Sequence, residues 1–127
     1  MRAFWRSCVA LAVLLLPSAL SAQSFTTKDL RENCAGVAGG EKSPTVIACL
    51  SYVGGFRDGY IADVADVVAK AGGRNVEGRH SVCIPDDATN SQLAAVFVKW
   101  ANEHPEDWNR TAVGGLFRAF LETWKCK

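Results

Sequence analysis

The chain has 127 residues, with 14 basic and 13 acidic side chains and a formal net charge of +1. This length accommodates one domain around one hydrophobic core. The balanced charge lacks the basic excess that is typical of proteins binding nucleic acid or anionic membrane surfaces, so we expect neither kind of partner.

The start of the chain has the pattern of a secretory signal peptide over residues 1–22. Arg2 and Arg6 supply a positive start, and an unbroken apolar run over residues 8–16 precedes small residues. That run is too short to span a bilayer, which disfavours the alternative of an N-terminal anchor helix. We therefore predict export to the periplasm, no membrane attachment after cleavage, and a single mature domain over residues 23–127.

Four cysteines remain once Cys8 leaves with the signal peptide: Cys34, Cys49, Cys83 and Cys126. An even number of cysteines in a small exported chain predicts disulfide bonds. Three pairings are possible. We favour a bond between Cys34 and Cys49, which would join two neighbouring helices. The second bond would then join Cys83 to Cys126 and tie the C-terminal end to a loop.

Two helices are expected in the first half of the mature chain. The first covers residues 27–37, with Thr27 as its N-cap. The second covers residues 44–71 and begins at Ser43-Pro44, a capping residue followed by the residue preferred at the first helical position. Its apolar residues recur with the helical period: Val46, Leu50, Val53, Tyr60, Val64 and Val68. Three glycines interrupt it and indicate a kink or the close approach of another helix: Gly54, Gly55 and Gly59.

Two further helices follow the longest irregular stretch, residues 72–90. The third helix begins at a cap formed by Thr89 or Asn90 and ends before Pro105. Its expected inner face is Leu93, Val96, Phe97 and Trp100. The last helix carries the clearest apolar stripe: Val113, Leu116, Phe117, Phe120, Leu121 and Trp124. We therefore predict an all-α fold, a small antiparallel cluster of about four helices joined by two disulfides, with Trp108 as the most exposed aromatic residue.

The candidate catalytic and metal-binding residues are few. His80 lies three residues before Cys83, which raises the possibility of a thiol nucleophile or a metal site. No Cys-x-x-Cys motif is present, and His104 is the only other histidine, so the signal for zinc is weak. A catalytic thiol would also have to stay reduced in an oxidising compartment. With no convergent acid, base and nucleophile, we expect no enzyme activity, no metal and no cofactor, but a binding role.

Arg57 and Asp58 interrupt the apolar stripe of the second helix. One interpretation is an ordinary solvated ion pair, which contributes little to stability. The other is a buried contact from Asp58 to a neighbouring helix end beside glycines that permit close packing. The sequence alone leaves both interpretations open.

Several short motifs together resemble one known family. They are Cys49-x-x-Tyr52-x-x-Gly55-x-x-Asp58-Gly59, Cys83-Ile84-Pro85, Gln92, His104-Pro105 and the closing Cys126. This set resembles the Rap/Tai-type immunity proteins, which are periplasmic antidotes to peptidoglycan amidase toxins delivered by type VI secretion. The resemblance runs from about Cys34 to the end. One departure is Lys125, where the family more often has a proline.

The resemblance implies an all-helical, disulfide-bonded and often homodimeric inhibitor without enzyme activity, which blocks the active-site cleft of an amidase effector. A protruding loop commonly does the blocking, and here the segment most able to protrude is 72–81. Its polar side chains are the predicted partner-binding residues: Arg74, Asn75, Glu77, Arg79 and His80. The alternative is a housekeeping periplasmic binding or chaperone-like protein that shares the fold but has no toxin partner.

Overall fold

The computed structural model describes residues 23–72 and 82–127, so the predicted signal peptide lies outside it. Within those two ranges the elements are α1 (Thr27–Cys34), α2 (Pro44–Lys70), α3 (Asn90–Glu103), the 3₁₀ turn η1 (Pro105–Asp107) and α4 (Ala112–Thr123). The only extended pairings there are two isolated antiparallel bridges, Thr26 with Thr111 and Val82 with Lys125. The all-α prediction of about four helices is therefore confirmed. None of these helices combines the length and apolarity needed to cross a bilayer.

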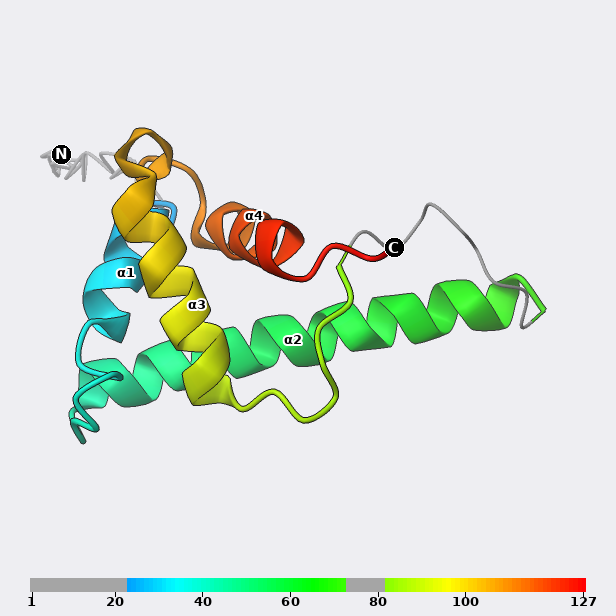
Figure 1. Ribbon diagram of the computed structural model, residues 1–127, viewed down its shortest axis with the longest axis horizontal. Coiled ribbons are helices and arrows are strands. Elements are labelled where there is room, and N and C mark those ends of the chain that lie inside the picture. The colour runs from blue at the N-terminus through cyan, green and yellow to red at the C-terminus, as the bar shows by residue number, and fades with distance from the viewer. Residues whose placement is uncertain (1–22, 73–81) are drawn as a thin grey trace, which may run out of the picture.

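The long helix α2 is the base on which the other helices pack (Figure 1). Helices α1 and α3 lie side by side over its N-terminal half, and α4 contacts both of them. All the buried residues of α2 fall in that half: Val46, Cys49, Val53 and Gly54. The C-terminal half of α2 consequently extends beyond the other helices (Figure 1).

Helix α1 begins and ends differently from its prediction. Its N-cap is Thr26, whose hydroxyl accepts a hydrogen bond from the backbone N–H of Asp29 while the Asp29 carboxylate accepts one in return. The predicted cap, Thr27, is instead fully buried against α4. The helix ends at Cys34 rather than residue 37, because Ala35 already bonds to the carbonyl of Glu32 three residues back.

The core matches only part of each predicted apolar face. In α4, Leu116 and Phe120 are fully buried, whereas Val113 is 49% and Phe117 36% exposed. In α3 the alanines Ala94 and Ala101 are buried in addition to Leu93, Phe97 and Trp100, and Val96 is half-buried. The small residues let neighbouring helices approach, so the buried face of each helix is rotated toward them from the predicted stripe.

Trp108 was expected to be the most exposed aromatic residue, and this prediction is wrong. Its side chain is half-buried, and its indole N–H donates a hydrogen bond of 2.8 Å to the carbonyl of Ala101. The guanidinium of Arg31 lies 4.6 Å from the ring centroid. Phe25, Tyr52 and Phe117 are more exposed than Trp108.

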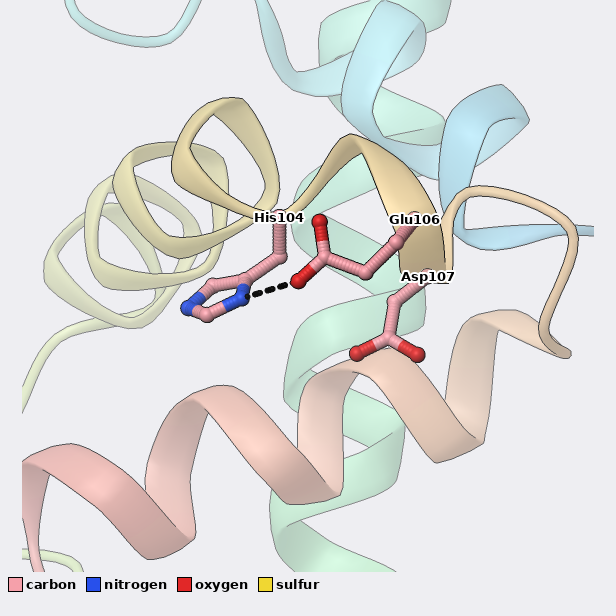
Figure 2. A group of neighbouring side chains, drawn as sticks. All are labelled: His104, Glu106 and Asp107. Carbon is pink, nitrogen blue, oxygen red and sulfur yellow. Dashed lines mark hydrogen bonds and ion pairs between the residues drawn. The ribbon is translucent and has the colours of Figure 1, made fainter.

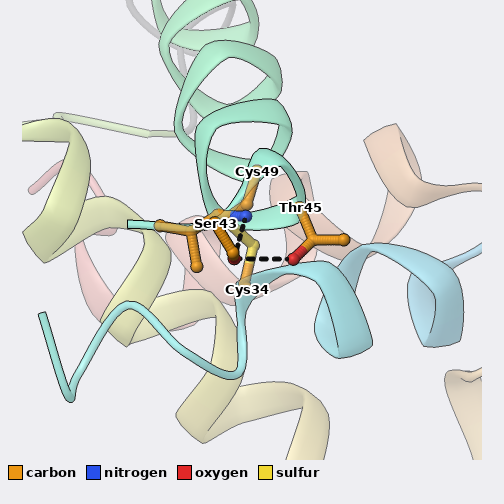
Figure 3. The surroundings of a disulfide bond; sticks show 5 residues. Cys34, Ser43, Thr45 and Cys49 are labelled. Carbon is orange, nitrogen blue, oxygen red and sulfur yellow. Dashed lines mark hydrogen bonds between the residues drawn. A yellow bond between two sulfur atoms is a disulfide. The ribbon is translucent and has the colours of Figure 1, made fainter. Parts of the chain in front are cut away.

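Both favoured disulfide pairings are confirmed, Cys34 with Cys49 and Cys83 with Cys126. The first bond joins the end of α1 to the second turn of α2, next to the N-cap residue Ser43 (Figure 3). The hydroxyl of Ser43 accepts a hydrogen bond from the backbone N–H of Val46. The cap and the bond therefore fix the same helix end.

The three glycines of α2 do not interrupt the helix. A Cβ atom at Gly54 would lie 2.6 Å from the side-chain amide nitrogen of Asn90, so close approach by α3 accounts for that glycine. A Cβ atom at Gly55 or Gly59 would meet no atom within 4 Å, so both of these glycines face open space.

The carboxylate of Asp58 is 74% exposed and pairs with Arg57, which supports the interpretation of an ion pair at the surface. Arg57 makes the tertiary contact, donating to the carbonyl of Ala88 at 2.8 Å.

Candidate partner-binding surface

The five predicted partner-binding residues lie outside the described residues: Arg74, Asn75, Glu77, Arg79 and His80. The structure does describe Gly72, the first residue of the predicted loop 72–81, and Val82, which follows it. Gly72 follows the C-cap of α2 with a φ of 67°, a backbone conformation that glycine adopts without strain. Val82 begins the segment that leads to α3, and its side chain is only 5% exposed.

Val82 is held by a side chain from α2 and by the C-terminal segment. The hydroxyl of Tyr60 donates to the carbonyl of Val82 and accepts from its N–H, both at 3.2 Å. Val82 also forms the bridge with Lys125, and the N–H of Cys83 donates to the carbonyl of Trp124 at 2.7 Å. The backbone at this end of the predicted loop therefore has a fixed position and direction.

A groove of about 440 Å³ lies between the C-terminal half of α2 and the segment after Val82. Its lining is predominantly apolar, with one basic and one acidic side chain: Arg57, Tyr60, Ile61, Val64, Val82, Cys83, Ile84, Pro85 and Asp86. Ile61 is 52% exposed at this surface. The groove offers contact area for an apolar side chain, and these lining residues bring together no combination of acid, base and nucleophile.

A second surface is an exposed apolar strip formed by Phe25 before α1, Tyr52 on α2, and Val113 and Phe117 on α4. The rings of Phe25 and Tyr52 lie with their centroids 5.3 Å apart. Tyr52 and Phe56 line a shallow hollow with Val113, and Phe117 lies one helical turn beyond Val113. Exposed apolar residues gathered in this way are typical of protein–protein contact sites.

His104, Glu106 and Asp107 are close together where α3 turns into η1 (Figure 2). The His104 Nδ1 lies 2.9 Å from a carboxylate oxygen of Glu106, and its ring stacks on Trp100 with centroids 4.8 Å apart. Asp107 is buried and accepts hydrogen bonds from Arg110 and Arg118 on its two oxygens. A cation would have to compete with both guanidinium groups for Asp107, so the group is better suited to holding η1 against α4 than to binding a metal.

The hydrogen bonds within this cluster shift three pKa values. The bond to Glu106 raises the pKa of His104 above its ordinary value of 6.5, and the same bond lowers the pKa of Glu106. The hydrogen bond from Arg110 lowers the pKa of Asp107, with a further contribution from the charge of Arg118. At neutral pH both carboxylates are therefore ionised.

We expect His104 to make stability depend on pH above its ordinary pKa. A histidine with a raised folded-state pKa stabilises the fold fully below pH 6.5, and this contribution is lost as the pH rises through the raised value. The difference in Tm between the wild type and His104→Gln should therefore shrink between about pH 5.5 and about pH 8.5. Thermal unfolding of both proteins across this pH range measures the Tm difference. A difference that grows with pH would contradict a raised pKa of His104 in the folded state.

The sequence did not indicate the tertiary contacts that the side chains of Tyr60, Arg57 and Asp107 make. Tyr60 looked like one more member of an apolar stripe, because the partner of its hydroxyl lies on a separate segment. Asp107 carried a local signal, the basic Arg110 three residues later, which is a spacing that permits an ion pair. Nothing in the local sequence indicates the contact with Arg118.

A comparison with protein-family models finds one described as Rap1a immunity proteins, which matches residues 26–126. The match covers all the described helices, both disulfides, the groove, and every residue of the apolar strip except Phe25. Searches of curated proteins and of solved structures find no significant match.

Proposed function

We propose that this chain, which belongs to the Rap1a immunity protein family, is a periplasmic inhibitor without enzyme activity that binds and blocks a type VI secretion peptidoglycan amidase toxin. The main support for this proposal is the family match over residues 26–126. The amidase class of the toxin rests on the motif resemblance. Export is supported by the signal-peptide pattern and by two disulfides, which persist in oxidising compartments.

The proposed inhibitory element is the segment 72–81, entering the cleft of the toxin. Its polar side chains would hydrogen-bond to groups of the cleft: Arg74, Asn75, Glu77, Arg79 and His80. Support comes from its flanks, because the end of α2 precedes it and Val82 is fixed by Tyr60 and the C-terminal segment. Fixing the flanks before binding reduces the conformational entropy that association removes, which favours tight binding at an interface of ordinary size.

We further propose that the protein forms a homodimer through the exposed apolar strip. Burial of Phe25, Tyr52, Val113 and Phe117 against a second copy would remove apolar surface from water, which is the main driving force for such contacts. Sedimentation equilibrium of the oxidised protein tests this. If the protein remains a monomer at high concentration, the strip is not a homodimer interface.

Replacing residues 74–80 with a Gly/Ser linker of the same length is expected to abolish inhibition and leave folding intact. The reason is that the polar contacts disappear while Gly72, Tyr60 and Val82 remain. The measurement is peptidoglycan hydrolysis by the amidase encoded beside the gene, titrated with the oxidised inhibitor, together with circular dichroism of each variant.

A matched control removes an exposed ion pair elsewhere. Lys28 and Glu32 on α1 are both more than half exposed, and α1 lies over the N-terminal half of α2, away from its C-terminal end (Figure 1). The variant Lys28→Ser/Glu32→Ser should inhibit like the wild type. Full inhibition by the linker variant would place the contact surface elsewhere. An unaffected amidase even with wild-type protein would favour the housekeeping role.

A further inference from the structure

The two disulfides differ sharply in their exposure to solvent. Cys34 and Cys49 are 1% and 0% exposed and belong to the hydrophobic core. Cys83 is exposed and Cys126 is half-buried at the molecular surface. A thiolate must reach a sulfur atom to open a disulfide, so the surface bond can be attacked in the folded protein, whereas the core bond requires prior unfolding.

The exposed bond holds the last residues of the chain to the segment that follows Val82. Helix α4 ends at Thr123, and the last backbone contacts are the Cys83–Trp124 hydrogen bond and the bridge between Val82 and Lys125. Both contacts lie within two residues of a bonded cysteine. Cys83 also lines the groove beside α2. Opening the bond would therefore release the C-terminal residues and one wall of the groove, while the helices keep their own core and their own disulfide.

We propose that Cys83–Cys126 is a redox-sensitive bond, which a dithiol reductant opens in the folded protein and which must be closed for partner binding. One thiolate of the reductant attacks the Cys83 sulfur, the bond to Cys126 breaks, and Cys126 leaves as a thiolate that takes up a proton. The second thiol of the reductant attacks the mixed disulfide and releases Cys83, so the reductant ends as a disulfide and the protein gains two electrons and two protons.

The requirement for a closed bond rests on the proposed function. Val82 is held from one side by Tyr60 and from the other by the C-terminal segment, and opening the bond weakens the second contact while the hydrogen bonds to Tyr60 remain. A protein with a free C-terminal end would therefore stay folded but lose more conformational entropy on binding. Inhibition would be restricted to an oxidising compartment.

The first test measures the order of reduction. The exported, oxidised protein is treated with dithiothreitol without denaturant, quenched with acid, labelled with a maleimide and mapped by peptide mass spectrometry. We expect a species labelled only at Cys83 and Cys126, formed at least about tenfold faster than label at Cys34 or Cys49. Simultaneous labelling of all four cysteines, or earlier labelling of the core pair, would overturn the proposal.

The second test uses the variant Cys83→Ser/Cys126→Ser, which mimics the open form without reductant. It should keep the helical circular dichroism of the wild type and inhibit the amidase at least about tenfold more weakly. Inhibition equal to that of the wild type would overturn the requirement for a closed bond. If the oxidised wild type itself fails to inhibit, the proposed function is wrong, whereas the labelling order still decides which bond is redox-sensitive.

Discussion

Replacing Gly115 with alanine should destabilise the protein by about 1 to 3 kcal/mol, although alanine is the better helix former. A Cβ atom there would lie 2.4 Å from the hydroxyl oxygen of Thr27 and 2.9 Å from its methyl carbon. Thr27 cannot move away, because it is fully buried, its hydroxyl donates to the carbonyl of Thr111, and its backbone N–H donates to Arg110. Helices α1 and α4 would have to separate.

The matched control is Gly59→Ala on α2. A Cβ atom at Gly59 meets no atom within 4 Å, so only the helix propensity changes. That substitution should stabilise the protein by about 0.5 to 1 kcal/mol. Urea unfolding followed by circular dichroism gives both free energies. The two glycine-to-alanine substitutions should thus change the free energy of unfolding in opposite directions. A stabilising Gly115→Ala would contradict the close packing of α1 against α4.

Features determined by neighbours in the sequence were predictable. The start of α2 at Ser43-Pro44 and the start of α3 at a cap formed by Thr89 or Asn90 depend on side chains that bond within three residues, and the cap of α3 is Thr89. The disulfide pairing followed because Cys34 and Cys49 lie on consecutive helices. Each of these signals is local, and each expectation was confirmed.

Features determined by contacts between distant segments were not predictable. Val113 and Phe117 have the same helical spacing as buried residues, but they are exposed because α4 packs against α1 and α3 with the face that carries Leu116 and Phe120. Thr26 and Thr27 are equally good caps by composition. The bridge from Thr26 to Thr111 and the packing of Thr27 against Gly115 decide between them. The fixed position of Val82 likewise depends on Tyr60 and Lys125, both more than twenty residues away.

The variant Cys34→Ala/Cys49→Ala should lose about 3 to 5 kcal/mol of unfolding free energy. Closure of a loop between residues 15 apart accounts for about 3 kcal/mol in the chain-entropy model. Two sulfur atoms also leave a fully buried part of the core, which adds the cost of a cavity. For a small domain this is a large share of a typical total stability of about 5 to 15 kcal/mol.

The comparison variant, Cys83→Ala/Cys126→Ala, separates loop entropy from burial. Its cysteines are 43 residues apart, so loop entropy alone predicts the larger effect, about 4 kcal/mol. The structure predicts the smaller effect, because removing exposed sulfur leaves no core cavity. The residues after Trp124 can also fray and regain entropy in the native state. Chemical denaturation of both variants decides the ranking. A greater loss from the exposed pair would mean that closing the longer loop outweighs the burial of the core bond.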